Sequence, residues 1–123
     1  MILLDTNILI EIYRNNVTIS SIVDNIQEIA VCDVVRAELF YGARNKRELQ
    51  EISADLEELI VLPLLPQISG MAVNLVKTYC LSHKFEFADA LIAATTIFHN
   101  AELFTLNKKD FAYIPNLKLY EPK

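Results

Sequence analysis

Glycine is scarce in this 123-residue sequence, which contains only two, and no repeat, linker or low-complexity segment interrupts the chain. Hydrophobic residues make up 53% of it, which is enough for a substantial core and unlike the composition of disordered proteins. The length is close to the usual size of one domain. We therefore expect residues 1–123 to form a single domain.

Long hydrophobic runs are also missing. No apolar stretch reaches the roughly 18 residues needed to span a membrane. Asp5 and Glu11 interrupt the apolar N-terminus, which lacks the basic start of a signal peptide. The sequence therefore predicts a cytoplasmic protein without a membrane segment. The mean hydropathy of +0.28 is nevertheless high for a small soluble protein, so we expect another chain to cover part of its apolar surface.

Cysteine occurs only at Cys32 and Cys80, and there is no CxxC pair. This argues against a zinc or redox site built on cysteine. Cys32 ends an apolar run, and Cys80 falls on the apolar face of a predicted helix. We expect both to be buried free thiols, because intracellular chains rarely keep disulfides.

An excess of positive charge is absent as well, since the net charge is −5. Taken alone, this counts against a nucleic-acid partner, which usually leaves a basic footprint on the protein. A cluster of carboxylates that holds cations would produce the same acidic excess. The motifs must decide between these two interpretations.

Apolar runs and helical periodicities alternate along the chain. Strands are predicted at 1–5, 29–32, 59–62, 102–105 and 117–119, the last at a sheet edge. Helices are predicted at 7–13, 18–27, 33–43 and 46–59, after Pro66, and at 87–98; the last is apolar almost all round and should be deeply buried. Thr6 or Asn7 is expected to cap the first helix and Asp33 the third. The alternation indicates an α/β fold with a mostly parallel sheet of four to five strands.

Polar residues follow several of the predicted strands. Asp5 closes the first strand, and Glu38 lies in the helix after the second. Asp89 lies in the first turn of the buried 87–98 helix, and Asn107 and Asp110 follow the fourth strand. Because ligands of open parallel sheets bind at the carboxyl ends of the strands, we expect these side chains to converge there.

Each acid also has a local explanation. Asp5 could cap the next helix, Asp89 could stabilise its helix N-terminus, and Glu38 could be solvated. However, Asp5 and Asp89 have apolar neighbours and no basic residue within a few positions, and an unpaired buried carboxylate is costly. A cation is therefore their natural partner. Oxygen ligands without cysteine or histidine favour Mg²⁺ or Mn²⁺.

Four motifs carry a resemblance to PIN-domain nucleases. The segments are MILLDTNILI at 1–10, VVRAELFYG at 34–42, FADALIAA at 87–94 and LFTLNKKDF at 103–111. The first and third are specific when they occur together in this order, and the resemblance spans nearly the whole chain. In length and motif order the chain most resembles the VapC-type toxins of bacterial toxin–antitoxin pairs.

The resemblance implies a three-layer α/β/α fold and hydrolysis of RNA phosphodiester bonds with Mg²⁺ or Mn²⁺. It also implies a homodimer and a cognate antitoxin that blocks the site. By position, the metal-binding catalytic carboxylates would be those of Asp5, Glu38 and Asp89. The groups that orient these ligands would be Thr6, Asn7 and Thr105.

The fourth motif departs from the family pattern. Family members often carry an acid two positions after Thr105, where this chain has Asn107. Asn107 can still offer a neutral oxygen ligand or hold a metal-bound water. Asp110 could supply the charge instead, although it could equally cap a short turn. The fourth position therefore stays open between the two.

Basic residues near the motifs are candidates for RNA contact. They are Arg36, beside the second motif, and Lys108 and Lys109 in the fourth. Another basic group, Arg44, Lys46 and Arg47, is more consistent with a solvated helix end. His83 and His99 lie near predicted helix C-termini, and the expected chemistry requires neither of them.

Three other functions match the sequence less well. An aspartyl-phosphate phosphatase needs a second Asp two residues after the first, and here Asn7 stands there. A receiver-like domain that only holds Mg²⁺ needs the same paired acids. A catalytically degenerate PIN fold kept as a binding module has one feature in its favour, Asn107.

Overall fold

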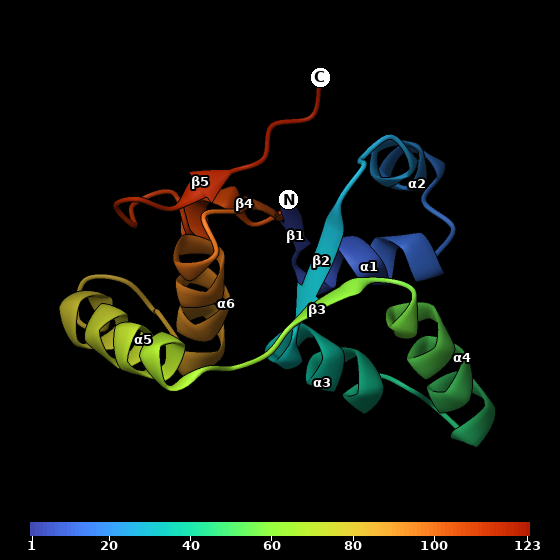
Figure 1. The fold of residues 1–123 in the computed structure, drawn as a ribbon, viewed down its shortest axis with the longest axis horizontal. Coiled ribbons are helices and arrows are strands. Elements are labelled where there is room, and N and C mark those ends of the chain that lie inside the picture. Colours follow the sequence, from blue (N-terminus) through green and yellow to red (C-terminus); the bar gives the residue numbers. More distant parts are fainter.

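The computed structural model describes residues 1–123 and contains one five-stranded sheet (Figure 1). Its strands are β1 (Ile2–Leu4), β2 (Ile29–Cys32), β3 (Ile60–Leu62), β4 (Glu102–Phe104) and β5 (Lys118–Leu119). The strand order is β3-β2-β1-β4-β5, and every neighbouring pair is parallel. The predicted parallel sheet is confirmed, and β5 is an edge strand as expected.

Six α-helices and one short 3₁₀ helix connect the strands. They are α1 (Thr6–Tyr13), α2 (Val17–Asp24), α3 (Asp33–Tyr41), α4 (Lys46–Glu57), α5 (Pro66–Tyr79), α6 (Phe87–Phe98) and η1 (Lys108–Asp110). In Figure 1, α5 and α6 lie on one side of the sheet, and α1, α2 and α4 lie on the other. The fold is therefore the expected three-layer α/β/α sandwich. None of these helices is long and apolar enough to cross a membrane.

The buried elements are those whose sequence is apolar throughout. All three residues of β1 are buried, in keeping with its place at the centre of the sheet. Helix α6 is buried from Ala90 to Thr96, as its sequence predicts. Its two buried hydroxyls do not remain unpaired, because Thr95 and Thr96 donate to the carbonyls of Leu91 and Ile92 one turn earlier.

Two expectations about local structure were wrong in detail. Helix α1 is capped by Asp5, whose Oδ1 accepts from the Thr6 N–H, and not by Thr6 or Asn7. Asp33 is the first residue of α3, and Cys32 occupies the cap position. The Asp33 carboxylate instead accepts from Arg36 and from the Leu64 N–H, so it ties α3 to the segment after β3.

The two cysteines differ in environment. Both are free thiols, and Cys32 is buried at the end of β2 as expected. Cys80 is exposed, which corrects the expectation that both would be buried. The last residue of α5 is Tyr79, so Cys80 is the C-cap at the end of the helix and not a residue of its packed interior.

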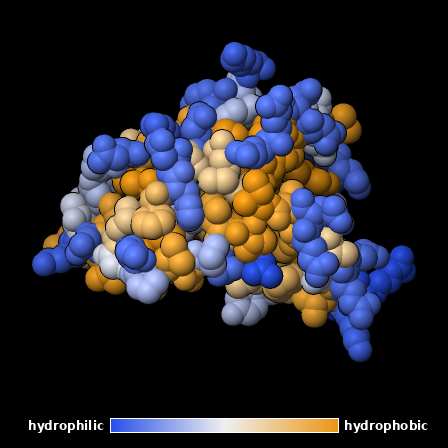
Figure 2. All heavy atoms as spheres, in the orientation of Figure 1, coloured by the Kyte–Doolittle hydropathy of each residue, from blue (hydrophilic) through white to orange (hydrophobic).

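Apolar side chains remain on the surface, as the mean hydropathy suggested. Figure 2 shows them gathered across the middle of one face, with hydrophilic residues around them. Among the exposed large apolar residues are Val17, Tyr41, Leu81 and Phe87. Such a surface is typical of proteins that bind another chain.

Strand order determines where the site lies. The chain leaves β1 towards β2 and β3 on one side, then returns to place β4 on the other side of β1. The connections after β1 and β4 therefore diverge to opposite sides of the sheet. This point, at the carboxyl ends of β1 and β4, is where open α/β sheets bind their ligands.

Candidate active site

Asp5 stands at this divergence point, directly after β1. Its backbone N–H donates to the Phe104 carbonyl at 2.9 Å, which continues the β1–β4 pairing. Its side chain is only 7% exposed. It accepts from the Thr6 N–H at 2.8 Å, from Thr105 Oγ1 at 2.7 Å and from Asn7 Nδ2 at 3.3 Å. Three donors thus fix the orientation of this carboxylate.

Burial raises the pKa of Asp5 above its ordinary value. The hydrogen bonds from Thr105 and Thr6 oppose this rise, and the negative charges of Glu38 and Asp110 add to it. The carboxylate is therefore well hydrogen-bonded but poorly compensated in charge.

Thr105, at the end of β4, joins three parts of the site. Its hydroxyl donates to Asp5, accepts from Asn7 Nδ2 at 3.4 Å and accepts from the Asn107 N–H at 3.1 Å. Asn7 in turn accepts from the Leu106 N–H at 3.2 Å. These bonds hold the loop after β4 against the start of α1. Asn7 and Thr105 therefore make the contacts expected of groups that orient Asp5.

Glu38 reaches the site from α3. Its Oε1 accepts from Thr6 Oγ1 at 2.8 Å, so Thr6 contacts two of the three acids, Asp5 through its backbone and Glu38 through its hydroxyl. The Glu38 side chain is otherwise exposed. Of the three predicted carboxylates, it has the most freedom to move.

Asp89 approaches from the first turn of α6. Burial, then the charges of Asp5, Glu38, Asp110 and Glu86, raise its pKa from 3.8 to about 6. The structure thus brings the three predicted acids within electrostatic reach of one another. Glu86 lies one turn before Asp89 and was not predicted as a site residue. Its separation from Asp89 by three positions, which places two residues on the same side of a helix, was visible in the sequence.

The fourth position has two candidates that differ in charge and contacts. The Asn107 backbone is fixed by Thr105, while its side chain is exposed and forms no hydrogen bond. Asp110, in η1, is also exposed, but its charge raises the pKa values of both Asp5 and Asp89. Asp110 is therefore the candidate that acts electrostatically on the cluster.

No basic side chain compensates this cluster. None of Asp5, Glu38 and Asp89 forms an ion pair, and two of the three basic candidates for RNA contact are paired with other acids. Arg36 pairs with Asp33 at 2.9 Å, and Lys108 pairs with Glu121. All four arginines of the chain pair with an acid on the same or an adjoining helix turn. Lys109 is the candidate RNA-contact residue that remains unpaired.

The donor set fits a hard divalent cation. Carboxylate oxygens are the ligands that Mg²⁺ and Mn²⁺ prefer, and burial together with neighbouring acids raises the pKa values of Asp5 and Asp89. In the side-chain positions of this structure, no three acidic, histidine or cysteine side chains converge closely enough to chelate one ion. Glu38 is the exposed member of the three predicted acids and is held by one hydrogen bond from Thr6.

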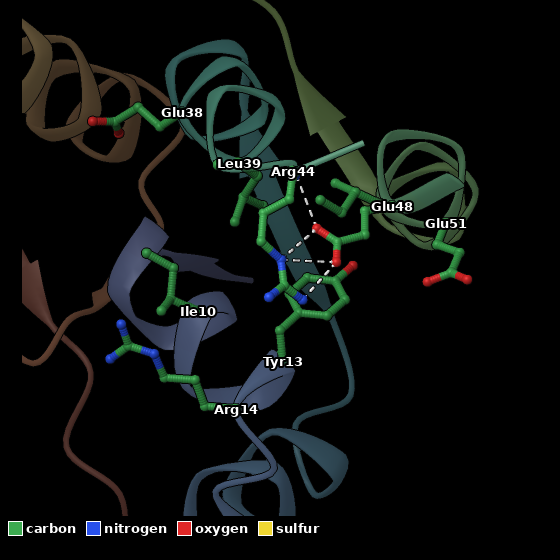
Figure 3. Close-up of a pocket in the computed structure, with 10 residues that line it drawn as sticks. Ile10, Tyr13, Arg14, Glu38, Leu39, Arg44, Glu48 and Glu51 are labelled. Atoms are coloured by element: carbon green, nitrogen blue, oxygen red, sulfur yellow. Dashed lines mark hydrogen bonds and ion pairs between the residues drawn. The ribbon is translucent and has the colours of Figure 1, made fainter. Parts of the chain in front are cut away.

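A cleft of about 640 Å³ runs beside Glu38 between α1, α3 and α4 (Figure 3). Ile10 and Tyr13 line one wall and are partly exposed. In the cleft, the Arg44 guanidinium donates to Glu48 Oε2 at 2.7 Å and 3.0 Å and to Glu48 Oε1 at 3.2 Å. Glu38 lies at the margin with its carboxylate directed away from Arg44. The cleft is thus apolar on one side, acidic on another, and leads to the acid cluster.

Residues 2–117 match the family described as PIN domain. The chain belongs to the PIN domain family. A curated relative, ribonuclease VapC19 of Mycobacterium tuberculosis, is 32% identical over 123 residues, which cover 96% of this chain and 98% of the relative.

Solved structures agree with this PIN assignment. A toxin–antitoxin complex from Klebsiella pneumoniae superposes with a TM-score of 0.83 at 29% identity, covering 98% of this chain and 99% of that chain. VapBC-1 from nontypeable Haemophilus influenzae gives 0.83 at 27% identity, covering 98% of both chains. VapBC2 from Rickettsia felis, bound to a DNA fragment from its promoter, gives 0.73 at 30% identity, covering 98% of both chains.

Proposed function

We propose that this PIN domain protein is a divalent-metal-dependent endoribonuclease and the toxin of a toxin–antitoxin pair. The observation that carries the proposal is the uncompensated cluster of Asp5, Glu38 and Asp89 at the divergence point of the sheet. The 32% identity of this chain to a ribonuclease over almost the full length supports the same activity.

Mg²⁺ or Mn²⁺ at these carboxylates would supply a water of lowered pKa and stabilise charge on the leaving oxygen. The chain's own contribution is to hold the ligands. Thr105 and Thr6 fix the Asp5 carboxylate, and Thr6 also holds Glu38. Asp89 must be deprotonated to bind a cation, so cation affinity should increase as the pH rises through about 6.

The fourth ligand position is assigned to Asp110 in this proposal. Its charge acts on both Asp5 and Asp89, whereas the Asn107 side chain is exposed and forms no hydrogen bond. Asn107 would then stabilise the loop through its backbone N–H, which donates to Thr105 Oγ1. An acid three residues further along would thus replace the acid that is missing at position 107.

RNA would be bound mainly through a few cations and the bound metal, because the protein is acidic overall. Lys109 is the most available of the predicted contacts, since it lies beside Asp110 and has no ion pair. Arg36 and Lys108 would need to exchange Asp33 and Glu121 for a phosphate. We therefore place Lys109 first among the phosphate contacts.

An antitoxin partner is proposed from the structures of toxin–antitoxin complexes that this chain resembles. The cleft in Figure 3 suits an apolar segment that carries an arginine, because its lining combines the apolar Ile10 of α1 with the acid Glu51 of α4. A homodimer also belongs to the proposal. An apolar hollow of about 590 Å³ that includes the exposed Tyr41 and Phe87 is the surface we assign to it.

The test is cleavage of single-stranded and structured RNAs by the purified chain, with a DNA of the same sequence as control. We expect cleavage of RNA that stops with EDTA and returns when Mg²⁺ or Mn²⁺ is added in excess. Cleavage that continues unchanged in EDTA would refute metal dependence. Failure to cleave any RNA at any metal concentration would favour the degenerate binding module.

A further inference from the structure

Four aromatic rings gather where the α5–α6 connection meets the segment after η1. Tyr113 stacks on His83 with ring centroids 3.7 Å apart and an interplanar angle of 10°. Tyr79 presents its ring edge-on to both of them, at 6.0 Å from His83 and 5.0 Å from Tyr113. Phe85 contacts Tyr79 and Tyr113 edge-on from the buried side. We refer to these four residues as the aromatic cluster.

The aromatic cluster borders the acid cluster. Tyr113 follows Asp110 by three residues, and the charges of Asp110 and Asp89, together with burial, raise its pKa. These two carboxylates come from η1 and α6, so Tyr113 is a member of the aromatic cluster that lies within electrostatic reach of the proposed metal ligands. A nucleotide that places its phosphate at the acids therefore has an aromatic surface beside it.

The exposed member of the aromatic cluster is His83. Tyr113 covers one face of its ring, and the residue as a whole is exposed, whereas Tyr79 and Tyr113 are half-buried. Ser82 Oγ lies 2.8 Å from His83 Nδ1 and restrains the orientation of the ring. Lys84, the next residue, forms no ion pair. A restrained ring with one open face and a free cation beside it is the arrangement that binds an unstacked base and its phosphate.

We propose that the open face of His83 is a stacking site for one unpaired RNA base, which extends the Tyr113–His83 stack next to the catalytic acids. This inference rests on the proposed function, because it assigns part of the substrate of that same site. It makes the enzyme favour single-stranded segments, since a base within a duplex cannot reach the ring. If His83 had only a structural role, the environment of its ring would not depend on whether the bound strand carries bases.

The chain contains no tryptophan, which allows a direct test by fluorescence. His83→Trp is made in an Asp5→Asn background, which we expect to abolish cleavage, and is titrated with a short single-stranded RNA and with an abasic strand of equal length. We expect the RNA to quench the tryptophan and the abasic strand to leave it unchanged. Val17→Trp, on the exposed surface of α2, is the matched control and should respond to neither.

A second variant keeps the test independent of the introduced ring. His83→Ala in the otherwise native protein should raise KM for RNA by about 5- to 100-fold, the effect of losing one base stack, with a smaller change in kcat. Leu81→Ala, in the same turn and fully exposed, should leave KM unchanged. Thermal unfolding of His83→Ala within a few degrees of the native protein shows that the fold is retained.

The outcomes separate this inference from the proposed function. If the native protein cleaves RNA but quenching of His83→Trp is the same with and without bases, the stacking site is wrong and the nuclease remains. An unchanged KM for His83→Ala overturns it equally. If the native protein neither binds nor cleaves RNA, the proposed function fails and this inference fails with it.

Discussion

Asp89 offers a test in which stability and activity should change in opposite directions. Without metal, burial and neighbouring acids raise its pKa from 3.8 to about 6, so the folded protein holds the proton more tightly than the unfolded chain. The free energy of unfolding therefore falls as the pH rises from about 4 to 6, and this loss of stability is complete at neutral pH. Asp89→Asn cannot titrate and should escape this loss.

The size of the effect follows from the same pKa. A rise of about two units corresponds to about 3 kcal/mol, which solvent screening of a half-exposed carboxylate reduces to about 1.5–2 kcal/mol. Loss of the favourable interaction between the carboxylate and the N-terminus of α6 removes about 0.3–1 kcal/mol of this gain. The net stabilisation of about 1 kcal/mol corresponds to a rise in Tm of about 4 °C for a chain of this length.

Thermal unfolding in EDTA at pH 7.5 and at pH 4 measures this difference. Asp89→Asn should be more stable than the native protein at pH 7.5, and the two should converge at pH 4. Glu102→Gln is the control, because Glu102 lies at the start of β4, away from the site, and forms no ion pair. Added Mg²⁺ should raise the Tm of the native protein more than that of Asp89→Asn. A lower Tm for Asp89→Asn at pH 7.5 would refute the reasoning.

Three further predictions concern the groups around the acids. Thr105→Val removes a buried hydroxyl that takes part in three hydrogen bonds. It should lower the free energy of unfolding in urea by about 1–3 kcal/mol. An unchanged unfolding midpoint would contradict the role of Thr105 in holding the loop after β4 against α1. Asp110→Asn should weaken Mg²⁺ binding, measured by calorimetry, by at least about tenfold, while Asn107→Ala should leave the affinity unchanged. If instead only Asn107→Ala weakened Mg²⁺ binding, Asn107 would be the fourth ligand. Asn45→Ala removes the N-cap side chain of α4, which accepts from the Glu48 N–H. It should lower the free energy of unfolding by about 1 kcal/mol, measured as a lower Tm, and leave the rate of RNA cleavage unchanged.

Much of the fold could be predicted because hydrophobic periodicity is a local signal. β1 and α6 are apolar throughout and lie where their sequences placed them. Errors arose at element ends, where one residue decides the environment. Cys80 continues the periodicity of α5 but falls beyond its last turn, and Asp33 has the chemistry of a cap but pairs with Arg36 from inside the helix.

The site was predictable in its acids but not in its surroundings. Asp5 and Asp89 stood out because a carboxylate within an apolar run requires a partner, and the sequence offered none nearby. The engagement of Arg36 by Asp33 and of Lys108 by Glu121 could not be read from spacing alone. The stack of Tyr113 on His83 joins residues 30 positions apart, and only the folded chain reveals it.

The most direct measurement of the central claim is the single-turnover rate of RNA cleavage for three charge-removing variants. Asp5→Asn, Glu38→Gln and Asp89→Asn are compared with the native protein and with Glu102→Gln at saturating Mg²⁺. We expect each of the first three to lose at least about a hundredfold in rate, because preorganised electrostatic stabilisation is removed, and Glu102→Gln to keep the native rate. Full cleavage activity in all three would contradict this expectation.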